Sequence, residues 1–316
     1  GDISLILAKT SRSGLSLCSG VAHAVPAGFE KQTVVKDKKA VHKITGKSVK
    51  GKTLRFYKYS WFSDSIRCGN PEEETEKKLK KVMMQPVEEL YGEQEEYLSD
   101  YWEKSNLEIE GDEELNSAVH YNQYALLQSV GKDCYSNMAA KGLSGEGYEG
   151  HFFWDTEMYA LPCFTITRPE IAKTLISFRY RTLNQAKENA RKLGHKRGAL
   201  YPWRTINGEE CSGYFPSGTA AYHISGDIAY SVAAYYLATN DVEFLCEQGA
   251  EILLETARLW VDMGNDVDGQ FHIQDVTGPD EYTCMVNNNY YTNLLAKYNL
   301  EWAEKCKELL MAEGKW

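Results

Sequence analysis

The spacing of apolar residues divides the chain into a strand-rich beginning and a helical remainder. Residues 54–61 alternate between apolar and polar side chains, and short apolar runs broken by Ser and Gly precede them. Both patterns are typical of β-strands. From about residue 111 the apolar residues recur at intervals of three and four, which is typical of helices. The sequence therefore predicts a β domain over residues 1–66 and a helical domain over residues 111–316.

A charged segment connects these two parts. The composition changes abruptly at PEEETEKKLKK (71–81), and charged residues continue to dominate up to about residue 110. Apolar residues are too sparse here for helices that are buried on every side. We therefore predict a helical linker over residues 67–110, made of two helices with one docked face.

The clearest helical pattern covers residues 169–193. Pro169 suits the first position of a helix, and Gly194 suits the position after its end. An arginine interrupts an otherwise apolar face and is more often paired with a structural partner than used to bind a ligand. The residues of this face are Ala172, Ile176, Arg179, Leu183, Ala186, Ala190 and Leu193.

Two further helices and a hairpin are predicted after this helix. The helices cover about 224–238 and 241–263, and Asp241 is a candidate N-cap for the second. A turn at Asp268 and Gly269 then predicts a short hairpin.

Composition and charge exclude several functional classes. The formal net charge is −10 and no basic stripe is interleaved with aromatic residues, which argues against nucleic-acid binding. The eight cysteines show no CxxC spacing, so we expect neither a disulfide framework nor a zinc site, and we expect a reducing, cytoplasmic compartment. No signal peptide or membrane-spanning run is visible. Because Gly1 is not an initiator Met, we expect a piece of a longer protein.

Three segments interrupt the helical pattern and share one chemistry. Residues 142–159, 197–218 and 268–293 are each rich in Gly, aromatic residues and carboxylates. We predict that they converge on one pocket at one end of a toroid of paired helices. Flat aromatic faces combined with fixed hydrogen-bond acceptors suit a sugar. The aromatic candidates are Trp154, Trp203 and Tyr282, and the acceptor candidates are Asp155, Glu157, Glu209, Glu210 and Glu281.

Each of these residues also has a structural interpretation. Asp280 and Glu281 follow Pro279, as acidic residues do at the start of a helix. Trp154 and Trp203 would also suit a hydrophobic core. Other catalytic patterns are absent from the sequence, including G-x-S-x-G, HExxH and a dinucleotide fingerprint after a strand.

The same segments resemble a known enzyme family. GHFFWDTEMYALP, GALYPWRTINGEE and VTGPDEYTCMVNNNYYTN closely resemble glycoside hydrolase family 65, the family of the maltose, kojibiose and trehalose phosphorylases, and the resemblance extends over about 111–303. It implies an N-terminal β-sandwich, a helical linker and an (α/α)6 barrel. The expected fold is therefore mainly α, an incomplete (α/α)6 barrel preceded by a partial β-sandwich. The front of the sandwich, the later barrel helices and a small C-terminal domain are missing from the chain.

The resemblance also implies a reaction. Inorganic phosphate would cleave an α-glucosyl disaccharide with inversion, giving β-glucose 1-phosphate and a free sugar, without a metal or another cofactor. The Glu of the GPDEY motif would be the general acid, and it falls on Glu281. The residues expected to bind the sugar are Phe153, Trp154, Asp155, Trp203, Glu210 and Tyr282. Family members commonly form homodimers.

Glu281 must carry a proton to donate it, so we expect an apolar, aromatic pocket around it, with Asp280 pointing elsewhere. Two alternatives stay open. A family hydrolase of kojibiose or trehalose would need a base that activates water, and the three segments do not clearly supply one. A non-catalytic carbohydrate-binding module would bind sugar without turnover. The residues that hold phosphate in this family lie C-terminal to the chain, and the sequence does not choose among disaccharides.

Overall fold

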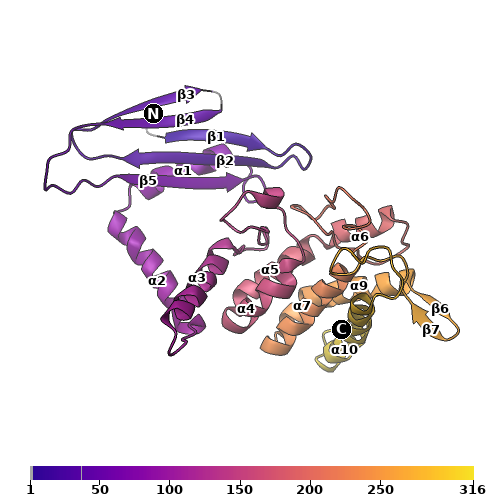
Figure 1. Ribbon diagram of the computed structural model, residues 1–316. Coiled ribbons are helices and arrows are strands. Elements are labelled where there is room, and N and C mark those ends of the chain that lie inside the picture. The colour runs from indigo at the N-terminus through magenta and orange to yellow at the C-terminus, as the bar shows by residue number, and fades with distance from the viewer. Residues whose placement is uncertain (1–2, 37) are drawn as a thin grey trace. The chain divides into compact units, whose positions relative to one another are not determined.

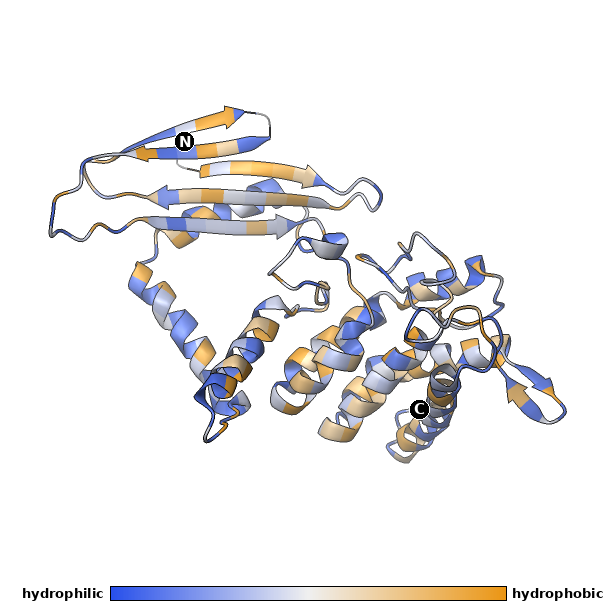
Figure 2. Cartoon of the chain, in the orientation of Figure 1, coloured by the Kyte–Doolittle hydropathy of each residue, from blue (hydrophilic) through white to orange (hydrophobic). Residues whose placement is uncertain are grey.

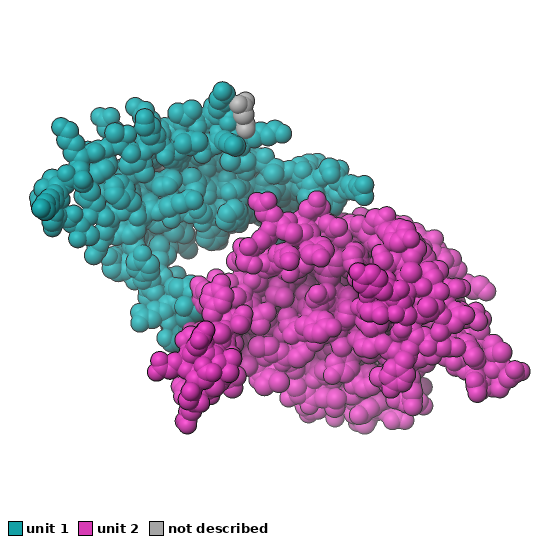
Figure 3. Space-filling view, in the orientation of Figure 1, with its two compact units in different colours: residues 1–100 teal, residues 101–316 magenta. Residues whose placement is uncertain are grey.

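The computed structural model describes residues 3–36 and 38–316 and shows two compact units. The first unit is Gly1–Asp100 and the second is Tyr101–Trp316 (Figures 1 and 3). We describe each unit by itself. The second contains all three of the segments that the sequence marks as candidates for chemistry.

The first unit is built on an antiparallel sheet, as predicted for residues 1–66. The sheet has the order β1-β2-β5, and a separate hairpin pairs β3 with β4. These strands are β1 (Ile3–Lys9), β2 (Ser16–Ala24), β3 (Glu30–Lys36), β4 (Lys39–Thr45) and β5 (Tyr57–Asp64). Helix α1 (Pro71–Met83) packs on the sheet over β2 and β5. Gly20 permits this packing, because a Cβ there would lie 2.5 Å from Thr75 and 2.6 Å from Leu79.

Two helices were predicted in the charged segment, and two are present. Asn70 caps α1 by accepting a hydrogen bond from the backbone N–H of Glu73, and Pro71 occupies the first helical position. The boundary between the units falls within α2 (Val87–Ser105). Figure 2 shows α2 as mostly hydrophilic.

The second unit is mainly helical, as predicted. Its helices pack in the pairs α4–α5, α5–α7, α7–α9, α7–α10 and α9–α10, and α7 is buried on nearly every side. A short hairpin follows α9 (Figure 1). The helices are α3 (Glu113–Ser129), α4 (Leu161–Thr167), α5 (Pro169–Arg181), α6 (Leu183–Lys192), α7 (His223–Thr239), α8 (Val242–Phe244), α9 (Ala250–Met263) and α10 (Tyr290–Ala312). The hairpin strands are β6 (Asn265–Val267) and β7 (Gln270–His272).

The single helix predicted over 169–193 is broken at Thr182, between α5 and α6. The hydroxyl of Thr182 donates hydrogen bonds to the carbonyls of Phe178 and Arg179, at 3.1 and 3.2 Å. The hydroxyl of Tyr201 donates to the same Arg179 carbonyl at 2.9 Å. In a continuous helix the carbonyl of Arg179 would accept a hydrogen bond from the backbone N–H four residues later. Here the hydroxyls of Thr182 and Tyr201 bond to it instead, which interrupts the backbone hydrogen bonds of the helix. The predicted face is nevertheless correct, because six of its residues are buried and Leu193 is partly buried.

The other predicted helices and the hairpin are confirmed. Residues 242–263 are helical throughout, with one π turn at Leu245–Gly249 between α8 and α9. Asp241 caps this helix by accepting from the N–H of Phe244 at 2.9 Å. The hairpin turns at Asp268 and Gly269, whose positive φ angles of 53° and 77° suit a two-residue turn.

The interpretation of Asp280 and Glu281 as a helix start is wrong, because α10 begins at Tyr290 after the N-cap Asn289. The Asp280 carboxylate instead accepts from the backbone N–H of Thr283 at 2.9 Å and from its hydroxyl at 2.6 Å, which closes a turn. Glu281 has a left-handed φ of 59°, which a helix cannot continue.

Candidate active site

The three predicted loops meet within the second unit. A backbone bridge joins the first loop to the second, since the N–H of Phe152 donates to the carbonyl of Thr205 at 2.7 Å. The rings of Phe153 and Trp203 contact edge to face, with centroids 5.0 Å apart. The indole N–H of Trp203 then reaches the third loop and donates to Oε1 of Glu281 at 3.1 Å. The expected general acid is therefore connected to an aromatic wall.

Glu281 itself is exposed, which corrects the expectation of an apolar, buried setting. The reason is the turn described above, which places Glu281 at a loop tip. Tyr282 is 98% exposed and contacts no other ring among the described residues, so the structure does not show it lining a pocket. Asp280 does point elsewhere, because Thr283 occupies both of its carboxylate oxygens.

The first loop contributes the buried side of the site. Phe153 is 6% exposed and Trp154 is 9% exposed. Trp154 packs edge to face on His223, with centroids 4.9 Å apart, and at a tilt against Tyr159. Asp155 is exposed as a whole residue, but partial burial of its carboxyl group raises its pKa. The neighbouring Glu157 carboxylate acts in the same direction.

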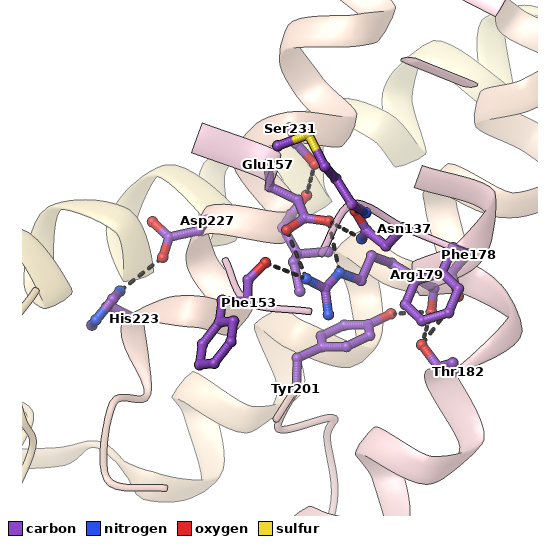
Figure 4. A network of polar contacts seen from close by, with 12 residues as sticks. Asn137, Phe153, Glu157, Phe178, Arg179, Thr182, Tyr201, His223, Asp227 and Ser231 are labelled. Atoms are coloured by element: carbon purple, nitrogen blue, oxygen red, sulfur yellow. Dashed lines mark hydrogen bonds and ion pairs between the residues drawn. The ribbon is translucent and has the colours of Figure 1, made fainter. Parts of the chain in front are cut away.

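Glu157 was a candidate acceptor for sugar, but its carboxylate is fully used inside the protein (Figure 4). Oε1 accepts from Nε of Arg179 and Oε2 accepts from Nη2, both at 2.7 Å, and neither side chain is exposed. Asn137 donates to Oε1 at 3.0 Å. Arg179 Nη2 also donates to the carbonyl of Phe153 at 3.1 Å, which anchors the first loop. Arg179 is thus the paired structural residue that the sequence predicted.

Glu210 holds the second loop in shape. Its carboxylate accepts from the backbone N–H groups of Trp203 at 2.8 Å, Arg204 at 3.3 Å and Ser212 at 2.8 Å. Burial raises the pKa of Glu210, and these N–H donors oppose that rise. Its neighbour Glu209 is exposed, and its carboxylate accepts from the side-chain amide of Asn207. Glu210 therefore fixes the backbone that carries Trp203.

A hydrogen-bonded triad that the sequence analysis did not identify lies beside Trp154, and its members His223 and Asp227 are buried. His223 Nδ1 lies 2.7 Å from Asp227 Oδ2, and the hydroxyl of Tyr291 donates to Asp227 Oδ1 at 2.7 Å. Burial raises the pKa of Asp227, and the two donors oppose the rise. Figure 4 shows the His223–Asp227 contact near Phe153. The available signal was a His and an Asp four residues apart in the otherwise apolar run HISGDIAY, which places both on one helix face.

No described helix meets the length and apolarity that crossing a membrane requires. Within residues 3–36 and 38–316, no three His, Cys, Asp or Glu side chains are grouped so that they could hold a metal ion.

Comparison with known proteins relates both units to one family. The model of the Glycosyl hydrolase family 65 central catalytic domain matches residues 120–315. The model of the Glycosyl hydrolase family 65 N-terminal domain matches residues 1–101. The chain is 49% identical over 306 residues to an alpha,alpha-trehalose phosphorylase of Geobacillus stearothermophilus, which covers 96% of this chain and 40% of that protein.

Other relatives agree with this assignment. A kojibiose phosphorylase of Halothermothrix orenii is 41% identical over 241 residues, which are 71% of this chain and 31% of that protein. A solved structure named "Putative kojibiose phosphorylase from human microbiome" superposes with a TM-score of 0.83 at 26% identity, covering 96% of this chain and 41% of that one. The chain thus spans about two fifths of the length of the trehalose phosphorylase. These matches, which agree with the motifs in the three loops, show that the chain belongs to glycosyl hydrolase family 65.

Proposed function

We propose that the protein containing this chain cleaves an α-glucosyl disaccharide with inorganic phosphate, and that α,α-trehalose is the first candidate substrate. Identity supports trehalose, because the chain is 49% and 53% identical to two trehalose phosphorylases and 41% identical to the kojibiose phosphorylase of Halothermothrix orenii. Kojibiose is the second candidate, supported by that relative and by the similar solved structure.

The observation that carries the chemistry is the contact between Trp203 and Glu281 at 3.1 Å. It connects one carboxyl group to the aromatic wall of Phe153 and Trp154. Glu281 would donate its proton to the glycosidic oxygen as the bond from that oxygen to the anomeric carbon breaks. An oxygen of phosphate would form the new bond to that carbon from the opposite face, which inverts the configuration. Because phosphate arrives as an anion, no second carboxylate is needed to activate water.

The remaining roles follow from this assignment. The glucose unit that is transferred to phosphate would stack on Trp154 beside Phe153, and Asp155 would accept from its hydroxyl groups. We also propose the finer architecture: part of a β-sandwich over 1–66, a helical linker over 67–110, and part of an (α/α)6 barrel over 111–316. The mainly helical packing of the second unit supports the barrel.

The test uses the protein at the length of its relatives, because this chain spans about two fifths of the trehalose phosphorylase. Trehalose, kojibiose, maltose and nigerose are incubated with and without phosphate, and proton NMR identifies the products. Phosphate-dependent release of β-glucose 1-phosphate is expected. Release of glucose without phosphate would instead show a hydrolase, and calorimetric binding without any product would show a binding module.

Glu281→Gln tests the assigned acid. It keeps the size of the side chain and removes the proton that it would donate, so turnover should fall by about 100-fold or more while the melting temperature stays unchanged. Glu301→Gln is the matched control, because Glu301 is an exposed carboxylate on α10 with an ion pair to Lys297. Retained activity of Glu281→Gln would refute the assignment.

A further inference from the structure

Glu281 is held by one group among the described residues. The indole N–H of Trp203 donates to Oε1 at 3.1 Å, and Oε2 receives no hydrogen bond from any residue that the structure describes. The two carboxyl oxygens are therefore not equivalent. A proton placed on this group would occupy Oε2, because Oε1 already faces a donor.

Trp203 is itself fixed from two sides. Its backbone N–H donates to Glu210 at 2.8 Å, and its ring meets the ring of Phe153 at an interplanar angle of 88°. The carbonyl of Phe153 is in turn bonded to Arg179, which is fully buried. A chain of contacts therefore leads from the core of the second unit to the exposed carboxyl group of Glu281.

The hydrogen bond from Trp203 to Glu281 has two effects on the carboxyl group. It uses the edge of the indole ring that carries Nε1. A hydrogen bond from an N–H group favours the ionised form of a carboxyl group, so it stabilises the product of proton donation. It also restricts the side-chain rotation of an exposed glutamate, which orients the acid before substrate binds.

We infer that Trp203 is a positioning residue for Glu281, with Glu210 as the residue that fixes its backbone, instead of a platform on which sugar stacks. This inference rests on the proposed function of Glu281 as the proton donor. It assigns Trp203 an effect on the chemical step, whereas a stacking platform would act on substrate binding.

The kinetic test is Trp203→Phe in the protein at the length of its relatives. Phenylalanine keeps an aromatic contact with Phe153 and removes only the N–H donor. We expect kcat to fall by about 10-fold and KM to stay within about 2-fold. Trp61→Phe makes the same change on β5 of the first unit, outside the candidate site, and should alter none of these. Unchanged kcat, or a change in KM alone, would overturn the inference.

A second measurement does not require turnover. In the chain with 15N-labelled tryptophan, the Nε1–H resonance of Trp203 should move when Glu281 is replaced by Gln, because its hydrogen-bond acceptor changes. Glu301→Gln should leave the resonance in place. A Trp203 resonance that is unchanged in Glu281→Gln would overturn the contact itself. Absence of phosphorolysis in the wild-type protein would overturn the proposed function and would leave this spectroscopic result standing.

Discussion

Replacing Arg179 by methionine tests how the candidate site is anchored to the core. The substitution keeps a long apolar side chain and removes both hydrogen bonds to Glu157 and the one to the carbonyl of Phe153. Glu157 would remain buried with only the amide of Asn137 as a donor. A buried carboxylate that loses its partner is far costlier than a lost surface ion pair, because water cannot replace the partner.

The magnitude follows from this burial. Breaking a buried ion pair by removing one partner costs about 3–5 kcal/mol. For a domain the size of the second unit, each kcal/mol lowers the melting temperature by about 2–4 °C, so the expected decrease is about 6–20 °C. Arg191→Met is the matched control on the following helix. Its ion pair with Glu188 is exposed, at 65% and 53% for the two side chains, so it should cost no more than about 1 kcal/mol.

Differential scanning calorimetry measures both variants. The double variant Arg179→Met with Glu157→Leu adds a second criterion, because apolar replacement of a whole buried pair is often close to neutral. We therefore expect the double variant to be more stable than Arg179→Met alone, by about 1–3 kcal/mol. The reasoning is refuted if Arg179→Met melts within 2 °C or so of Arg191→Met, or if the two substitutions of the pair are simply additive.

Three further predictions concern the stability of the second unit. Gly194 and Gly198 have φ angles of 93° and 95°, so alanine at either position should cost about 1–2 kcal/mol of strain. At Gly198 the new Cβ would also lie 2.4 Å from the backbone nitrogen of Leu259, so this variant should melt lower by about 1–3 kcal/mol more, and equal melting would refute the steric argument. Asn289→Ala removes the cap of α10 and should lower the free energy of unfolding in urea by about 1 kcal/mol. Burial raises the pKa of Tyr222 to about 12 from its usual 10. The fold therefore favours the neutral phenol, and this stabilisation is complete below pH 10 and lost as pH rises to about 12. The expected loss is about 2–3 kcal/mol in urea unfolding, and it should be absent in Tyr222→Phe.

The helices could be predicted from the sequence because burial there follows a simple period. The predicted face of residues 169–193 is buried, including Arg179. The break at Thr182 could not be predicted, because it depends on the hydroxyls of Thr182 and Tyr201, and the second comes from the loop that follows the next helix. A periodic pattern indicates which side of a segment is buried. It does not indicate which backbone carbonyl will accept a hydrogen bond from a side chain of another segment.

The third loop was harder to predict because several of its residues have unusual backbone angles. Its conformation depends on left-handed backbone at residues that are not glycine. Asp and Asn are only enriched in this conformation, and Glu and Met do not indicate it at all. The positions are Asp275, Glu281, Met285 and Asn288. The carboxylates adjacent to Pro279 therefore looked like a helix start, although α10 begins at Tyr290.

Within the candidate site, the resemblance to a family selected Phe153 and Trp154 together with several carboxylates. The structure buries both aromatic side chains. Which carboxylate is free for substrate depends on partners, and Glu157 and Glu210 both have theirs inside the protein. Only contact geometry could separate these residues from Asp155 and Glu281.

The third loop combines a fixed base with an exposed tip. At its base, Thr277 N–H donates to the carbonyl of Ala220 at 2.9 Å, and Val276 bridges to Val286. At its tip, Glu281 is exposed and bonded to Trp203. A general acid works best where water is excluded, and the described residues do not exclude it at this tip. Under the proposed function, a disaccharide bound at Glu281 would supply that exclusion, and the substrate itself would complete the environment of the acid.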